Sequence, residues 1–251
     1  MNSIIKPKIV TISASDVAAC IGKNPYKSPD EIRTKILAKY GSDKTVKTKD
    51  QEVEALLATH ADAQSLLATI TESAGVASAA SVRQHIKEKL QLLQVDCTVE
   101  ERKQIEKYMY SKAATTHGTK TEDRTADCLG ANVARDETFY TYPLLTCMNV
   151  RFQIVGKIDR MQTEADGSKT IIEIKNRVRG LFGKVKEYEE IQVQTYMQLV
   201  GVERAQLIEQ DQSTGKINSY NLMRDETWWK EMEQELIAFC ETCVEKICVE
   251  K

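Results

Sequence analysis

Hydrophobic positions in this chain follow two periods, and the two periods dominate different parts of the sequence. Apolar residues three and four apart, the spacing of amphipathic helices, dominate the first half and return near the end. Alternating apolar and polar residues, the spacing of half-buried strands, are concentrated in between. The predicted helices lie at 13–20, 29–39, 50–94 (two helices), 99–113, 117–129, 188–200 and from 226 onward, and the predicted strands at 133–142, 149–159, 170–175, 205–209 and 216–222. The last two strands are predicted to form a β-hairpin around Ser213-Thr214-Gly215. The order of the elements predicts an α/β core with a mixed sheet flanked by helices.

Boundary signals support the helices of the first half. Ser13 or Ser15 is a suitable N-cap for the first helix, and Gly22 follows its end. Ser28 is a suitable cap for the second helix, and Pro29 takes its first position. The alanine-rich segment 50–94 has a weak break at Gly75–Ala80, which predicts an αα-hairpin. The sequence assigns no chemical role to this hairpin.

The stretch from Gly156 to Lys175 holds the most informative chemistry. It contains G-K-I-D-R, a polar turn with Asp166-Gly167, and T-I-I-E-I-K, a pattern that predicts a β-hairpin. Because side chains alternate across a strand, Glu173 and Lys175 share one face, while Ile172 and Ile174 pack on the other.

Asp159 stands near the end of the strand that precedes this turn. If it faces the same edge as Glu173 and Lys175, two carboxylates and an ammonium converge. Carboxylate oxygens suit Mg²⁺ or Mn²⁺, and a neighbouring lysine can orient or activate a water molecule for phosphodiester hydrolysis. The alternative is a solvated cross-strand ion pair, because a single E-x-K motif is common.

An Asp at the end of one strand, followed by E-x-K on the next, resembles the core of the PD-(D/E)XK nuclease superfamily. The proline that often precedes the Asp in that superfamily is replaced here by Ile158. The resemblance implies a restriction-endonuclease-like fold. On this basis we expect residues 1–251 to form a single nuclease domain, with a helical insertion at 41–98.

Further motifs resemble the YqaJ-type viral recombinases, the phage lambda exonuclease family. They are S-A-S-D, which contains Ser15, followed by the turn G-K-N-P-Y; a G-x-x-x-E formed by Gly118 and Glu122; and a Q-V-Q that begins at Gln192. In that family, the serine and an arginine seven residues before it help to hold a DNA 5′-phosphate. Lys8 stands at the arginine's position, and it keeps the charge but loses the bidentate fork.

The resemblance implies roles for these residues. Asp159, Glu173, the Ile174 carbonyl and Glu122 would bind one or two Mg²⁺ or Mn²⁺ ions. Lys175 would orient or activate the attacking water, and Gln192 would position Lys175 or the water. It also implies 5′→3′ digestion of double-stranded DNA ends, a single-strand annealing protein as partner, and a homotrimeric ring.

Composition adds limits to this interpretation. The 251 residues are 41% hydrophobic and 29% charged, with a formal charge of −2, so a DNA-binding surface must be a local basic patch. The candidate patch is the segment from Lys175 to Lys186, which has five basic residues and no acidic one; beyond Lys175 these are Arg177, Arg179, Lys184 and Lys186. A solvated loop is the competing interpretation. No long apolar run is present, so we expect an intracellular protein without a membrane segment.

Seven scattered cysteines do not suggest a disulfide framework. The C-terminal Cys240, Cys243 and Cys248, with one cysteine from upstream, have the composition of an iron–sulfur site, which some nucleases of this superfamily contain. Their helical spacing favours cysteines packed in a core instead. Two further alternatives stay open at this point: a non-catalytic DNA-binding or assembly module on the same fold, and an interaction protein that binds no metal.

Overall fold

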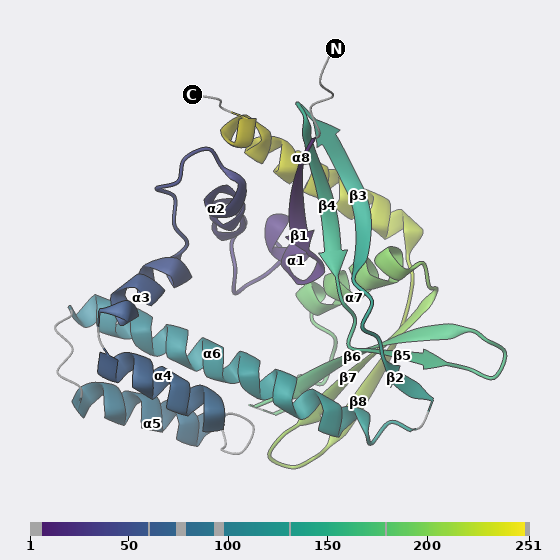
Figure 1. Ribbon diagram of the computed structural model, residues 1–251. Helices are drawn as coiled ribbons and strands as arrows, with labels where there is room; N and C mark the ends of the chain where they lie inside the picture. Colours follow the sequence, from purple (N-terminus) through teal and green to yellow (C-terminus); the bar gives the residue numbers. More distant parts are fainter. Residues whose placement is uncertain are drawn as a thin grey trace.

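Two mixed β-sheets form the centre of the computed structural model (Figure 1), which describes residues 7–59, 61–73, 79–92, 98–130, 132–178 and 180–248. The first sheet has the order β1-β4-β3 and contains β1 (Lys8–Ser13), β4 (Val150–Gly156) and β3 (Tyr140–Cys147). Strand β4 pairs parallel with β1 and antiparallel with β3. Its buried Phe152 and Ile154 face the main hydrophobic core.

The second sheet has the order β2-β5-β6-β7-β8. Its strands are β2 (Val133–Arg135), β5 (Arg160–Thr163), β6 (Lys169–Arg177), β7 (Arg204–Asp211) and β8 (Ile217–Met223). Only β6 and β7 pair in parallel. The two predicted β-hairpins are confirmed as the antiparallel pairs β5–β6 and β7–β8. Gly167, in the turn of the first, has a φ of 81°, a conformation that favours glycine.

Helices cover these sheets and close the main core. They are the short η1 (Ala14–Asp16) and α1 (Val17–Cys20), then α2 (Pro29–Tyr40), α7 (Glu187–Val200) and α8 (Glu226–Cys248). Ser28 caps α2 as predicted, in a reciprocal capping box with Glu31. Ser13 occupies the N-cap position of η1, but its side chain makes no capping hydrogen bond.

The alanine-rich segment forms three helices, so the prediction of two was wrong. These are α3 (Lys49–Ala58), α4 (Ala61–Ser73) and α5 (Ala79–Leu92), which pack on the first part of α6 (Val99–Ala126) around a separate apolar cluster that includes Leu57, Ile70, Ile86 and Met109 (Figure 1). The predicted break at Gly75–Ala80 lies mostly outside the described residues. The break that sequence reasoning missed follows Ala58, where Thr59 ends α3 with backbone bonds to Leu56 and Leu57.

Helix α6 is continuous, although the sequence predicted two helices there. Gly118 lies inside it and costs about 1 kcal/mol of helix propensity relative to alanine. The helix persists because its first half packs on the insertion through Ile105 and Met109, and its second half packs on β6 through Ala126. Tertiary packing on both sides outweighs the local preference of one glycine.

The predicted strand at 133–142 is divided because its two ends belong to different sheets. Strand β2 pairs with β5, whereas β3 pairs with β4. Asp136 supports the turn between them by accepting a hydrogen bond from the Thr138 amide. The predicted strand at 149–159 ends at Gly156, so Asp159 lies at the junction between the two sheets. No helix among the described residues is long and apolar enough to span a membrane.

Candidate active site

Asp159, Glu173 and Lys175 lie together where the chain passes from the first sheet to the second. Asp159 Oδ2 accepts a hydrogen bond of 2.8 Å from the Ile174 amide, which ties the sheet junction to β6. On β6, Lys175 Nζ donates to Glu173 Oε1 at 2.7 Å. Ile172 and Ile174 point to the opposite face and pack with Ile208 of β7. The shared face of Glu173 and Lys175, predicted from alternation alone, is confirmed.

Gln192 joins this group from α7. Its Oε1 accepts from Lys175 Nζ at 3.1 Å, and its Nε2 donates to Glu173 Oε1 at 3.0 Å and to the Tyr196 hydroxyl at 3.1 Å. The amide therefore contacts both partners of the Glu173–Lys175 pair. Asp159, Glu173, Lys175 and Gln192 are the candidate catalytic residues of the sequence analysis, and we call this group the catalytic cluster.

Lys175 is a cation in this cluster. Burial favours the neutral amine, but the Glu173 and Asp159 carboxylates outweigh it and raise the pKa of Lys175. A protonated lysine can donate hydrogen bonds to a water molecule or a phosphate oxygen and can stabilise negative charge there.

The carboxylates of the cluster fit a divalent cation. Glu173 is only 2% exposed, and its Oε2 atom has no hydrogen-bond partner among the residues that the structure describes. A buried carboxylate oxygen without a partner is costly, and a hard cation would satisfy it. Burial, together with the nearby Glu173, raises the pKa of Asp159 to about 7. The Lys175 ammonium therefore offsets the repulsion between the two carboxylates only in part, and a further positive charge would be favourable there. Among the described residues, no group of three or more His, Cys, Asp and Glu side chains forms a ready-made metal site.

Glu122 approaches from α6, but Arg160 holds it. Glu122 Oε1 accepts from Arg160 Nη1 at 2.7 Å, and the same nitrogen donates to the Asp159 carbonyl at 2.7 Å. Arg160 is 4% exposed and also pairs with Asp123. Burial and the nearby Asp159 raise the pKa of Glu122. Sequence reasoning missed Arg160, although its position directly after Asp159 in G-K-I-D-R was visible.

The structure places Arg177, one of the predicted DNA contacts, inside the fold. Its guanidinium is buried and makes a bidentate ion pair with Glu189 of α7, at 2.6 and 2.8 Å, and a third bond of 3.1 Å from Nε to Glu209 of β7. A buried guanidinium that makes these three bonds is not free to contact DNA phosphates. On an alternating strand it lies on the same face as Lys175, and its pairing with Glu189 ties β6 to the helix that carries Gln192.

The other residues that were predicted to contact DNA differ in exposure and in place. Lys184 is exposed, and Lys186 is half-buried with its Nζ 4.8 Å from the centre of the Phe182 ring. Arg179 lies outside the described residues. Lys8 is the first residue of β1, and Ser15 lies in η1, just beyond the other end of that strand. Roughly 16 Å of strand therefore separates Lys8 from the start of η1, so the structure does not bring the two residues together.

Glu209 of β7 holds the basic loop, residues 180–186, in place through its backbone. This fully buried carboxylate accepts hydrogen bonds of 3.1 Å from each of the Phe182 and Gly183 amides, 2.8 Å from the Tyr220 hydroxyl and 3.2 Å from Asn218 Nδ2, besides its pair with Arg177. Burial alone would raise its pKa, but these bonds lower the pKa to about 2.

We expect Glu209→Gln to lower the free energy of unfolding by about 3 kcal/mol, because Arg177 would lose part of a buried ion network. A depressed carboxylate pKa stabilises the fold above the unfolded value of about 4.5, and this contribution is lost as the pH falls towards about 2. Denaturant unfolding across this pH range should show a shallower slope for the variant. The control Glu203→Gln removes an exposed pair with Arg224 and should cost under about 1 kcal/mol. Equal effects of the two variants would contradict the anchoring role.

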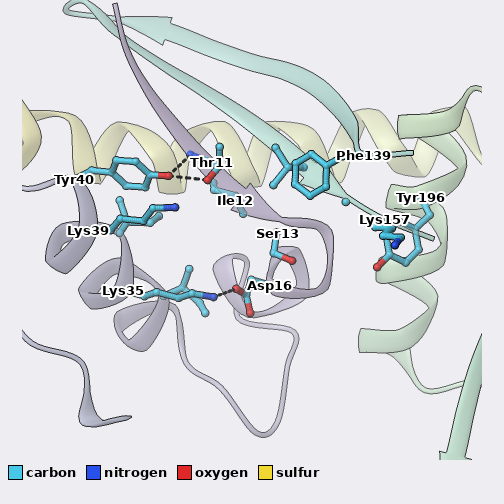
Figure 2. A pocket seen from close by; sticks show the side chains of 14 residues that line it. Thr11, Ile12, Ser13, Asp16, Lys35, Lys39, Tyr40, Phe139, Lys157 and Tyr196 are labelled. Atoms are coloured by element: carbon cyan, nitrogen blue, oxygen red, sulfur yellow. Dashed lines mark hydrogen bonds and ion pairs between the residues drawn. The ribbon is translucent and has the colours of Figure 1, made fainter. Parts of the chain in front are cut away.

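A cavity of about 430 Å³ is lined by residues of β1, α2, β4 and α7 (Figure 2). Lys35 and Lys39 of α2 line one side, Lys157 and Phe139 line another, and Thr11 and Ser13 of β1 lie between them. Tyr196 belongs to both sites, because its ring lines the cavity and its hydroxyl accepts from Gln192. We call this cavity the lysine pocket. Sequence reasoning missed all three lysines, since they come from segments that are far apart along the chain.

The C-terminal cysteines belong to the core, as their helical spacing favoured. Cys240 and Cys243 of α8 are buried in the same apolar cluster as Cys20, and burial raises the pKa of each of these thiols. Cys248 Sγ donates to the Met148 carbonyl at 3.3 Å.

Comparison with known proteins places the chain among nucleases. Residues 35–245 match the family described as the PD-(D/E)XK nuclease superfamily. Two solved structures with weak likeness are an alkaline exonuclease from Laribacter hongkongensis (18% identity, 70% of this chain and 86% of that one, TM-score 0.43) and a phage-related exonuclease from Haemophilus somnus 129PT (14% identity, 95% and 93%, TM-score 0.42). None of the curated proteins matches the chain.

Proposed function

The chain belongs to the PD-(D/E)XK nuclease superfamily, and from its site we propose that it is a metal-dependent exonuclease that digests double-stranded DNA from 5′ ends. The observation that carries this proposal is the catalytic cluster. It combines a buried, unpartnered Glu173 oxygen with the nearby Asp159 carboxylate and with a lysine held by Gln192. In this proposal the whole chain is one nuclease domain that carries the helical insertion 41–98.

Asp159, Glu173 and the Ile174 carbonyl would hold Mg²⁺ or Mn²⁺, and Glu122 would join them after release from Arg160, giving one or two ions. A bound ion would supply Lewis-acid polarisation of the scissile phosphate. The Lys175 ammonium orients the attacking water and stabilises charge on the phosphate, while Gln192 fixes the position of that ammonium. The water oxygen bonds to phosphorus and its proton passes to solvent, the bond from phosphorus to O3′ breaks and O3′ takes a proton from solvent, and the next nucleotide keeps a 5′-phosphate.

The lysine pocket supports an exonuclease over an endonuclease. Its lining includes three lysines and the hydroxyl groups of Thr11 and Ser13. Lys35 is paired with Asp16, so Lys39 and Lys157 supply the charge that suits a terminal phosphate. It also places positive charge and hydroxyl groups side by side, which Lys8 and Ser15 do not do because they lie apart. By the resemblance to lambda exonuclease, the product would be a single strand for an annealing protein, made by a trimeric ring.

The test is incubation of the purified protein with linear and covalently closed circular duplex DNA, in Mg²⁺, Mn²⁺ or EDTA. We expect metal-dependent loss of the linear DNA alone, with release of label from 5′ ends before 3′ ends. Linear DNA with 5′-phosphate ends should be degraded faster than DNA with 5′-hydroxyl ends, and Lys39→Ala with Lys157→Ala should reduce this preference.

Other outcomes of this cleavage assay would contradict the proposal in different ways. Cleavage of the circular DNA would identify an endonuclease, and early release of 3′ label would reverse the polarity. Survival of every substrate in every metal would favour the non-catalytic module. Iron and visible colour in the purified protein would favour the iron–sulfur alternative.

A further inference from the structure

Helix α7 presents three side chains at successive turns along one face. Tyr188, Gln192 and Tyr196 are four residues apart, so they lie in one row with a spacing of about 6 Å along the helix axis. Tyr196 lines the lysine pocket, and Gln192 contacts Lys175. Tyr188 therefore lies one turn beyond the catalytic lysine, on the side away from the pocket.

Tyr188 forms an aromatic pair with Tyr26, from the turn between α1 and α2. Their ring centres are 5.6 Å apart, and the rings are almost perpendicular at 87°. Tyr26 is 72% exposed, unlike Tyr196, which is buried in the core. One ring thus supports the other at the surface and leaves most of the Tyr26 ring open to solvent.

The turn that carries Tyr26 is held in place. Asn24 Oδ1 accepts from the Tyr26 amide at 2.8 Å and from the Lys27 amide at 3.2 Å. Lys27 Nζ in turn lies 3.0 Å from Asp16, a buried carboxylate that also lines the lysine pocket. An exposed aromatic ring on a fixed turn loses little conformational freedom when a flat ligand stacks on it.

We propose that Tyr26 and Tyr188 form a stacking site for an unpaired base of the substrate strand, within two nucleotides of the scissile phosphate. The ligand class follows from the chemistry, because aromatic rings stack on bases of any sequence, and those bases must be unpaired to offer a free face. The distance follows from the rise of about 6 Å along α7 between Gln192 and Tyr188, which is shorter than two nucleotide steps even at the B-form spacing of about 3.4 Å, and an unpaired strand extends further per nucleotide. Lys186, two residues before Tyr188, supplies positive charge for the phosphates.

The site deepens the proposed function, since its occupant is the strand that the catalytic cluster cleaves. Together the lysine pocket, the cluster and the tyrosine pair give a path along one face of α7. A nuclease with this path would separate the end of a duplex by holding one base of the cleaved strand on the tyrosines.

The experiment measures binding in EDTA, so that no cleavage occurs. A set of duplexes with frayed 5′ ends carries one abasic nucleotide at successive positions of the 5′ strand, and one duplex carries none. We expect Tyr26→Ala to weaken binding of the intact DNA about 10-fold. We expect no further loss from this variant on the duplex whose abasic nucleotide lies at the stacking position. Tyr26→Phe should bind as the wild type does, because stacking does not need the hydroxyl.

The control is Val99→Ala, which removes an exposed apolar side chain at the start of α6 and should leave binding unchanged. An equal loss for Tyr26→Ala on every abasic duplex, or no loss on any, would overturn the stacking site. If Tyr26→Ala does not fold, the wild-type protein alone tests the stacking site. Its affinity should drop when the abasic nucleotide is at one position near the end of the strand and not when it is at distant positions. If the wild type cleaves DNA but its affinity drops at no abasic position, only the stacking site is refuted. If it neither binds nor cleaves DNA, the proposed function is refuted.

Discussion

Replacement of Lys175 with alanine is expected to abolish DNA cleavage while the fold and DNA binding persist. The ammonium donates to Glu173 and Gln192 and is the cation that the chain itself places beside the two carboxylates. Its removal takes away both the group that orients water and the charge that stabilises the phosphate. Effects of this kind amount to about 10³-fold or more in rate. Neither strand pairing nor the apolar face of β6 depends on this side chain.

The measurement is the rate of nucleotide release in Mg²⁺ at saturating DNA, together with DNA affinity in EDTA and a thermal unfolding curve. Lys169→Ala is the matched control, because Lys169 lies on the same strand and in the same alternation but at its exposed start. The control should keep full activity. Full activity of Lys175→Ala would exclude the catalytic cluster as the centre of hydrolysis.

Asp159→Asn is expected to separate activity from stability. The change should abolish metal-dependent cleavage, because one of the two proposed carboxylate ligands is lost. It should also stabilise the metal-free protein by about 2 kcal/mol near neutral pH, because it removes a charge that burial and Glu173 oppose. The asparagine oxygen can still accept from the Ile174 amide, so the link between the sheet junction and β6 is kept.

The pH dependence of unfolding gives this prediction a definite sign. Because the pKa of Asp159 is raised from 3.8 to about 7, the folded protein binds the extra proton more tightly than the unfolded chain does. Stability of the metal-free wild type should therefore fall as the pH rises from about 4 to about 7, and the variant should lack this part of the slope. Asp166→Asn, in the exposed turn of the same hairpin, is the control and should change neither activity nor slope. A metal-free variant that is less stable than the wild type would contradict the repulsion between Asp159 and Glu173.

The buried ion network of Arg177, Glu189 and Glu209 shows why a basic segment of sequence is a weak guide to a binding surface. A run of basic residues in the sequence does not reveal which of them form ion pairs with acidic residues inside the fold. Arg177 follows Lys175 by two residues, so it shares the inward face of β6, and its partners come from α7 and β7. Of the predicted basic residues beyond Arg177 that the structure describes, Lys184 is exposed and Lys186 is half-buried.

The sequence by itself determined the local features of the site. Strand alternation set Glu173 and Lys175 on one face, turn residues predicted both hairpins, and a motif match selected Gln192 before any contact was known. These succeed because they depend on spacing within one element or one turn. Tertiary structure alone decided the long-range features, namely the continuity of α6, the pairing of Arg160 with Glu122 and the lysine pocket. Each of these results from packing or charge pairing between segments far apart along the chain, and no local pattern specifies which distant residue will be the partner.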